Sequence, residues 1–284
     1  MKIIVGKLAG FCGGVINSVS KTDKILNYGI KTYCLGELVH NKQVVDKLEK
    51  KGLIVVDSLD NVEDGSRVII RAHGVPKDVY DLAKKRNLEL YDLTCPNVLR
   101  IHEKAVKYKE EGYFIVLIAQ KDHPEAIGTI SFCGDDSIIL EDNEGINNVI
   151  DRFNKSGKKK LAIISQTTYS MAKFDKLVFE LKERLKDNEI KVDNTICSAT
   201  ELRQKETSKL AGDVDAMIII GGKNSSNTKK LYELASSKCK NSFIIETVKD
   251  LDNDFSCFNM VGVIAGASTP KESIEEVVEY LKKC

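Results

Sequence analysis

The chain has 284 residues, of which 42% are hydrophobic and 30% are charged, so it is long enough to bury a substantial core. Its 43 Lys and Arg residues balance 42 Asp and Glu residues, and the formal net charge of +1 excludes the strong positive field by which proteins bind nucleic acids or anionic membranes. We therefore expect any anionic ligand to be recognised by a local site.

The apolar segments and the cysteines indicate a soluble cytoplasmic protein. The longest strongly apolar segment, Tyr113–Ala119, is far shorter than the roughly 20 residues of a membrane-spanning helix, and residues 1–14 contain too many glycines for a secretory signal. The 8 cysteines include no C-x-x-C pair and are not densely spaced. We expect free thiols, and any metal site must use ligands that are far apart in the sequence.

Apolar, β-branched runs alternate with segments of helical periodicity along the chain, which predicts an α/β fold with mainly parallel sheets. Three strand-like runs lead to cysteines: residues 2–5 to Cys12, residues 88–91 to Cys95 and residues 190–192 to Cys197. The next strand-like run ends 28 positions beyond each cysteine, at His40, His123 and Ser225. This shared spacing predicts one supersecondary unit that is used three times.

A third equivalent position follows two strand-like runs later, at His73, Thr167 and Ser268. In parallel sheets, ligands bind at the carboxyl ends of strands, where helix N-termini present free N–H groups. We therefore expect three small α/β domains, at residues 1–96, 97–193 and 194–284, in a pseudo-threefold arrangement that directs these side chains into a central cavity. For the helix after Ser268, we expect Thr269 to act as the N-cap, with Glu272 completing a capping box.

The remaining cysteines lack this spacing, and we expect them to be packing or surface residues. Cys34 lies within a strand-like run, Cys284 is the last residue, and Cys133, Cys239 and Cys257 are expected in loops or at strand edges. His102, in the helical stretch 98–109, is likewise expected to be a surface or packing residue.

The segment Asp122-His-Pro-Glu125 places a carboxylate two residues from His123, across a proline that stiffens the loop. A histidine and a glutamate beside one ligand are suited to proton delivery. The alternative for Glu125 is a solvated surface carboxylate.

The segment Gly222-Lys-Asn-Ser-Ser-Asn227 joins the predicted strand 216–220 to a helix expected to begin near Thr228. Its hydroxyl, amide and backbone N–H groups can bind a phosphate group, and a plain connector with an N-cap is the alternative. The chain contains no Walker loop and no G-x-G-x-x-G motif, so nucleotide binding is not supported.

Three cysteines at equivalent positions leave one coordination position open, because a structural metal normally has four protein ligands. An open position suits a catalytic metal or a metal cluster that binds substrate. The spacing alone does not distinguish zinc from iron–sulfur, since both accept thiolates.

Nine motifs in the same order resemble the LytB/IspH family of 4-hydroxy-3-methylbut-2-enyl diphosphate reductases. They cover nearly the whole chain: Phe11-Cys-Gly-Gly14, Leu38-Val-His-Asn41, Arg71-Ala-His-Gly74, Thr94-Cys-Pro96, His123-Pro-Glu125, Gln166-Thr-Thr168, Thr195-Ile-Cys197, Asn224-Ser-Ser-Asn227 and Ala267-Ser-Thr-Pro270.

The resemblance implies three α/β domains around a 4Fe-4S cluster with three cysteine ligands and one open iron. The matching ligands are Cys12, Cys95 and Cys197, and the residues matching the diphosphate site are His40, His73, His123, Ser225, Ser226, Asn227 and Ser268. Glu125 and Thr167 match residues that bind the substrate hydroxyl and supply protons. The resemblance also implies reductive removal of the C4 hydroxyl, with electrons from an external ferredoxin or flavodoxin.

Two other functions remain open from the residues alone. One is an iron–sulfur sensor or binding module that recognises a phosphorylated metabolite without turnover. The other is a zinc hydrolase of phosphoanhydrides.

Overall fold

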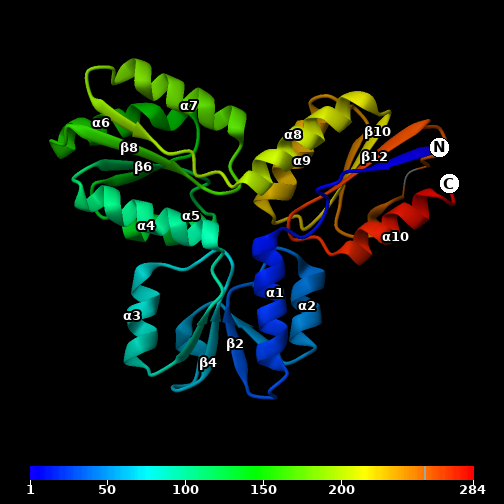
Figure 1. Cartoon of the computed structure of the whole chain (residues 1–284), viewed down its shortest axis with the longest axis horizontal. Helices are drawn as coiled ribbons and strands as arrows, with labels where there is room; N and C mark the ends of the chain where they lie inside the picture. The colour runs from blue at the N-terminus through cyan, green and yellow to red at the C-terminus, as the bar shows by residue number, and fades with distance from the viewer. Residues whose placement is uncertain (253) are drawn as a thin grey trace. The chain divides into compact units, whose positions relative to one another are not determined.

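The computed structural model describes residues 1–252 and 254–284, and these residues form three four-stranded parallel sheets (Figure 1). The first sheet has the order β3-β2-β4-β5 and contains β2 (Thr32–Leu35), β3 (Leu53–Val56), β4 (Arg67–Ile70) and β5 (Glu89–Asp92). The second has the order β7-β6-β8-β9 and contains β6 (Phe114–Ile118), β7 (Ser137–Leu140), β8 (Lys160–Ser165) and β9 (Glu189–Val192). The third has the order β1-β12-β10-β11 and contains β1 (Lys2–Val5), β10 (Ala216–Ile220), β11 (Ser242–Ile245) and β12 (Met260–Ala265).

Helices connect most of the strands, as parallel pairing requires. They are α1 (Gly13–Leu26), α2 (Lys42–Glu49), α3 (Lys77–Lys85), α4 (Pro96–Glu110), α5 (Pro124–Cys133), α6 (Ile146–Ser156), α7 (Met171–Arg184), α8 (Ser198–Asp213), α9 (Ser226–Ser236) and α10 (Lys271–Leu281). Short 3₁₀ turns occur at Leu59–Asn61, Asn143–Gly145 and Val248–Asp250. The expected α/β class with three parallel-sheet domains is confirmed.

The three sheets repeat one strand order. In each, the first strand in sequence of the repeat lies between the second and the third, and a fourth strand occupies one edge. In the third sheet this edge strand is β1, which pairs in parallel with β12 from Lys2 opposite Met260 to Val5 opposite Val263. The boundaries 1–96, 97–193 and 194–284 stay a prediction. β1 lies within the first of these segments but pairs in the third sheet, whose other strands lie within the last segment.

The second sheet is covered by helices on both faces, which explains why its central strands are continuous apolar runs. Alternate residues of β6 point to opposite faces: Val116 packs with α6 and α7, whereas Ile115 packs with α4 and α5. The third sheet follows the same pattern, with α10 on one face and α8 and α9 on the other.

The chain forms two compact units. Residues 1–19, 39–51 and 198–284 form one unit, which contains the third sheet, and residues 20–38 and 52–197 form the other, which contains the first and second sheets. Among the helices of the described residues, none has the length and apolar character that crossing a membrane requires.

Candidate functional site

Nine predicted site residues lie in segments that follow the carboxyl end of a strand and precede a helix, whereas Glu125 lies in the first turn of α5, and Ser226 and Asn227 lie in the first turn of α9. Cys12, Cys95 and Cys197 directly precede α1, α4 and α8. The polar positions are equivalent to one another: His40, His123 and Ser225 follow β2, β6 and β10, whereas His73, Thr167 and Ser268 follow β4, β8 and β12. The expectation that these residues lie beyond strand ends is therefore confirmed.

The backbone N–H of each of these cysteines donates to a carbonyl group in the loop after the neighbouring strand. Cys95 N donates to Ala72 O at 2.9 Å, and Cys12 N donates to Ala267 O at 3.1 Å. Cys197 N donates to Thr167 O at 3.1 Å. One hydrogen bond thus recurs in all three repeats and fixes the start of each following helix.

The degree of burial separates these three cysteines from the others. Cys12, Cys95 and Cys197 are partly exposed, whereas Cys34, Cys133 and Cys239 are buried and Cys257 and Cys284 are exposed. Burial raises the pKa of both the Cys34 and Cys133 thiols to about 12, so these side chains stay neutral. They behave as small apolar residues, as expected.

The expected position of Cys133 in a loop or at a strand edge is wrong. Cys133 is the last residue of α5, and its thiol donates to the Thr129 carbonyl at 3.5 Å. The helix ends after Cys133, where Gly134 leaves the helical conformation with a φ of 79°. Glycine adopts this conformation without steric cost.

In the unit of residues 20–38 and 52–197, His123, Glu125 and Thr167 lie together, and we call them the carboxylate site. His123 is the N-cap of α5, and its Nδ1 accepts a hydrogen bond from Glu125 N at 3.1 Å. The Glu125 carboxylate lies beside the loop after β8: Thr167 N donates to Oε1 at 2.5 Å, and Thr167 Oγ1 donates to Oε2 at 2.6 Å. Hydrogen bonds thus join these three predicted residues to one another.

Glu125 is not a solvated surface carboxylate, because only 2% of its surface is exposed. Burial raises the pKa of its carboxyl to about 7, and the two hydrogen bonds from Thr167 act in the opposite direction. Desolvation dominates because the charged form loses more hydration than two donors restore. A carboxyl group with this pKa carries a proton in a substantial fraction of molecules at neutral pH.

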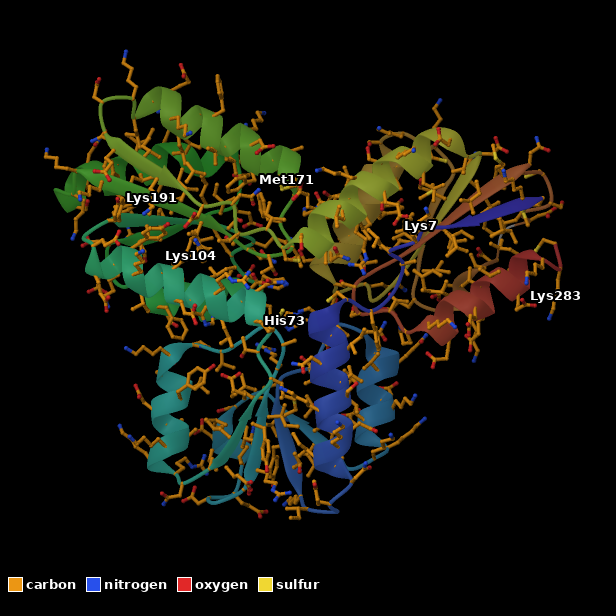
Figure 2. The ribbon with its side chains drawn as sticks, viewed as in Figure 1. Lys7, His73, Lys104, Met171, Lys191 and Lys283 are labelled. Carbon is orange, nitrogen blue, oxygen red and sulfur yellow. The ribbon has the colours of Figure 1, made fainter. Side chains whose placement is uncertain are left out.

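Two predicted histidines meet in the same unit. The rings of His73 and His123 are arranged edge to face, with centroids 5.6 Å apart. Figure 2 labels His73 in the segment between β4 and α3. The two imidazoles therefore place nitrogen atoms close to the carboxylate site.

In the unit of residues 1–19, 39–51 and 198–284, the second group contains Ser225, Ser226, Asn227 and Ser268, which we call the amide site. Ser225 is the N-cap of α9, where its hydroxyl accepts from Thr228 N at 3.3 Å. Ser268 Oγ donates to the His40 carbonyl at 3.0 Å. A Cβ atom at Gly222 would lie 2.5 Å from the same carbonyl oxygen, so the loop approaches His40 closely only because this residue is glycine.

Asn227 is a predicted member of the amide site whose side-chain amide is buried. Only 3% of its surface is exposed, and within the described residues neither its amide nitrogen nor its amide oxygen has a hydrogen-bond partner. A buried amide without partners costs free energy, so a bound group that supplies those partners would be stabilised. Asn227 also lies in the first turn of α9, where backbone N–H groups favour an anion.

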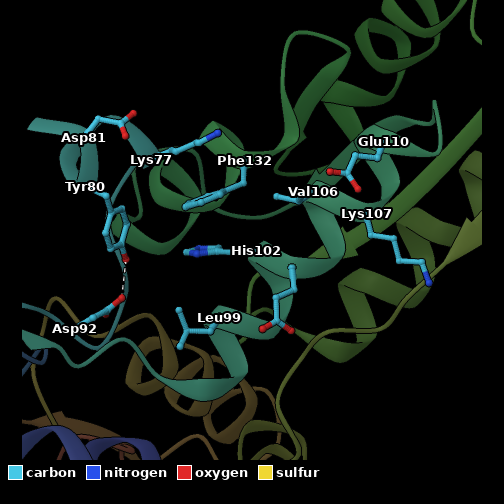
Figure 3. A pocket seen from close by; sticks show the side chains of 11 residues that line it. Lys77, Tyr80, Asp81, Asp92, Leu99, His102, Val106, Lys107, Glu110 and Phe132 are labelled. Carbon is cyan, nitrogen blue, oxygen red and sulfur yellow. Dashed lines mark hydrogen bonds between the residues drawn. The ribbon is translucent and has the colours of Figure 1, made fainter. Parts of the chain in front are cut away.

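His102 is a packing residue, as expected. Its ring stacks on Phe132 with centroids 4.2 Å apart, and burial lowers its pKa to about 4. Figure 3 shows both residues lining a cavity of about 600 Å³ with Leu99 and Val106 of α4. None of the residues predicted for the functional site lines this cavity.

One expected cap is wrong, and one buried residue was missed. The N-cap of α10 is Pro270 and not Thr269, because the Thr269 hydroxyl donates to the Ile220 carbonyl at 2.9 Å. Gln166 begins one of the nine motifs but was given no role in the site, although it is 1% exposed and joins two strand ends. It accepts from Gln120 N at 3.0 Å and donates to Thr168 Oγ1 at 2.9 Å. Its place beside Thr167 in a polar segment was the available signal.

Comparisons of the sequence and of the structure with known proteins lead to the same family. A family described as LytB protein matches residues 3–282. The 4-hydroxy-3-methylbut-2-enyl diphosphate reductase of Nitratiruptor sp. is 40% identical over 287 residues, covering 100% of this chain and 99% of that protein.

Two solved structures are also similar. The E-1-hydroxy-2-methyl-but-2-enyl-4-diphosphate reductase from Plasmodium falciparum has a TM-score of 0.92 and 32% identity, covering 99% of this chain and 88% of the other. An (E)-4-hydroxy-3-methyl-but-2-enyl diphosphate reductase described as the terminal enzyme of the non-mevalonate pathway has a TM-score of 0.72 and 38% identity, and both chains are covered completely.

Proposed function

The chain belongs to the LytB protein family, and we propose that it reduces (E)-4-hydroxy-3-methylbut-2-enyl diphosphate to isopentenyl and dimethylallyl diphosphate, the last step of the methylerythritol phosphate route. In this reaction the C4–O bond breaks and two electrons enter the allyl group. One proton leaves with the hydroxyl group as water, and a second proton joins carbon. The observation that carries the proposal is the buried Glu125 carboxyl, whose partner Thr167 also accepts the Cys197 N–H.

The first task of the chain is to deliver a proton to the leaving hydroxyl group. Glu125 suits this task because its pKa is raised to about 7, near the pH at which a cytoplasmic enzyme acts. Thr167 holds both carboxyl oxygens, so the orientation of the carboxyl group is fixed. We assign the proton transfer to Glu125, with Thr167 orienting the carboxyl and binding the substrate hydroxyl, and with His123 assisting proton delivery from the N-cap of α5.

The second task is to bind the diphosphate. We assign it to the amide site together with three imidazoles: Ser225, Ser226, Asn227, Ser268, His40, His73 and His123. The buried Asn227 amide and the first turn of α9 support this assignment, because both offer hydrogen-bond donors to an anion. A diphosphate supplies the acceptor oxygens that such donors require.

The family implies an iron–sulfur cofactor, and we propose a 4Fe-4S cluster with Cys12, Cys95 and Cys197 as ligands. The donor set fits, because these three cysteines are partly exposed and occupy equivalent positions in the repeat. Each also directly precedes a helix, whose N-terminus favours negative charge. When bound, the cluster supplies the electrons and one Lewis-acidic iron without a protein ligand.

The chain has no nucleotide-binding motif that would hold a hydride donor. We therefore propose that the electrons come from an external one-electron carrier, a ferredoxin or flavodoxin. We place the reaction in the cytoplasm, where free thiols persist.

The proposal is tested by purifying the chain without oxygen and measuring its iron, sulfide, zinc and absorption spectrum, followed by turnover of the diphosphate with an artificial reductant. We expect about four irons and four sulfides per chain and formation of both products. A colourless protein that contains zinc and hydrolyses phosphoanhydrides would overturn it. A 4Fe-4S protein that binds the diphosphate without turnover would instead support a sensor.

A further inference from the structure

The loop that leads from β1 to Cys12 is held from outside by the side chains of one helix. The loop comprises residues 6–11 and contains few bonds of its own; Ala9 N donates to Gly6 O at 3.2 Å. It begins at Gly6, whose N–H donates to Val263 O at 2.8 Å, and it includes Gly10, which has a φ of 99°. A segment with these glycines has many unfolded-state conformations, so its position depends on external contacts.

Arg203 of α8 binds two carbonyl groups of this loop. Its Nε donates to Leu8 O at 2.7 Å, and its Nη2 donates to Gly10 O at 2.6 Å. The side chain is 4% exposed, so these bonds form away from water. The planar guanidinium fixes the direction of both bonds, which a flexible ammonium group does not.

Glu206, one turn further along α8, binds two N–H groups of the same loop. Its Oε1 accepts from Lys7 N at 2.7 Å, and its Oε2 accepts from Leu8 N at 3.1 Å. Both backbone polar groups of Leu8 are thus held by ionised side chains of α8. Bonds of this kind are about twice as strong as those between neutral groups.

The position of α8 in the chain suggests what the bonds from Arg203 and Glu206 to the loop do. The helix begins at Ser198, directly after Cys197, and it holds the loop that ends at Cys12. We propose that Arg203 and Glu206 are positioning residues that fix the Cys12 loop for cluster binding, an inference that rests on the proposed function of Cys12 as a ligand. Groups that orient the ligands of a metal site commonly change metal affinity 10- to 100-fold when they are replaced.

Lys205 provides a matched control on the same helix. It forms an exposed ion pair with Glu201 at 2.6 Å and makes none of the loop bonds described above. The variants are Arg203→Met, which keeps the apolar stem, Arg203→Lys, which keeps the charge, and Glu206→Gln, which keeps one acceptor. Lys205→Met removes a charge from α8 without touching the loop bonds.

The experiment measures how fast each anaerobically prepared holoprotein loses its cluster to a chelator, together with its circular dichroism and the electron paramagnetic resonance spectrum of the reduced cluster. We expect Arg203→Met to lose the cluster about 10-fold faster or more and to show a changed spectrum. Arg203→Lys should restore part of both properties, and Lys205→Met should match the wild type. Hydrogen exchange at the Lys7 and Leu8 amides should accelerate in Glu206→Gln and not in Lys205→Met.

A folded Arg203→Met protein that keeps its cluster as long as the wild type, with an unchanged spectrum, would overturn the positioning role. If Arg203→Met does not fold, Glu206→Gln decides by the same rate comparison. A wild-type chain that holds no iron–sulfur cluster would refute the proposed function itself. A wild-type cluster that none of these variants affects would refute only the positioning role.

Discussion

The carboxylate site and the amide site occupy equivalent positions in two repeats, and they differ in how their buried side chains are hydrogen-bonded. His123 and Ser225 are both N-caps, and Glu125 and Asn227 both follow their cap by two residues. Both side chains are almost fully buried, at 2% and 3% exposed. Glu125 has two hydrogen bonds from Thr167, whereas Asn227 has no partner within the described residues.

The difference follows from the loop after the neighbouring strand. In the second sheet this loop supplies Thr167, whose N–H and hydroxyl both bind Glu125. In the third sheet the equivalent Ser268 donates to the His40 carbonyl and leaves Asn227 without a bond from that side. The equivalent position thus carries a buried carboxyl bonded by its own domain in one repeat and a buried amide without such bonds, among the described residues, in the other.

Replacing a proposed cluster ligand should have the largest effect, because the proposed reaction needs the cluster even when both sites are intact. We expect Cys12→Ser and Cys197→Ser to abolish bound cluster and turnover alike, because a hydroxyl group is a poor substitute for a thiolate ligand. Cys133→Ser should keep both, since its thiol is buried and neutral. Iron and sulfide analysis with an absorption spectrum checks this, and a full 4Fe-4S spectrum in Cys197→Ser would contradict the ligand assignment.

Replacing Glu125 by Gln breaks the carboxylate site alone. The amide keeps the size of the side chain and can still bond with Thr167, but it has no transferable proton. We expect cluster content and substrate binding to persist while turnover falls by about 10²-fold or more. The control is Glu144→Gln, because Glu144 is an exposed carboxylate in the connection between β7 and α6. Near-normal turnover in Glu125→Gln would remove this residue from the mechanism.

Changes at the amide site should weaken binding and leave the chemical step intact. Under the proposed assignment, Ser225→Ala and Asn227→Ala would each remove one hydrogen bond to a charged phosphate, which costs roughly 1.5–3 kcal/mol, or about 10- to 150-fold in the dissociation constant. The cluster spectrum should not change. Calorimetric titration with the diphosphate checks this, and unchanged affinity in both variants would contradict the assignment of the phosphate site.

The sequence predicted the positions of these residues better than their surroundings. Local apolar runs indicated each strand that precedes a site residue, and the spacing of 28 revealed the repeat. The pairing of β1 with β12 could not be predicted, because it joins strands from opposite ends of the chain and no local pattern encodes it. The burial of Glu125 and the failure of Thr269 as a cap likewise depend on partners, Thr167 and Ile220, that are distant in the sequence.

The last predicted effect is a pH dependence of stability, which of the two sites only the carboxylate site should show. The ordinary pKa of a glutamate carboxyl is 4.5, and burial raises the pKa of Glu125 in the folded protein to about 7. Below about 4.5 the group is protonated in both states, so it opposes folding least there. As the pH rises toward about 7, the unfolded chain releases its proton while the folded chain retains it, and the free energy of unfolding falls. The fall is on the order of 3–4 kcal/mol, since one pKa unit corresponds to ~1.4 kcal/mol.

Glu125→Gln lacks this titration, so its thermal midpoint relative to the wild type should increase between pH 4.5 and 7 and then level off. Asn227→Ala changes no titratable group, and its difference from the wild type should stay constant with pH. Thermal unfolding of the anaerobic proteins at several pH values measures both differences. A constant difference for Glu125→Gln would mean that the buried carboxyl keeps an ordinary pKa, and the electrostatic contrast between the two sites would then lose its physical basis.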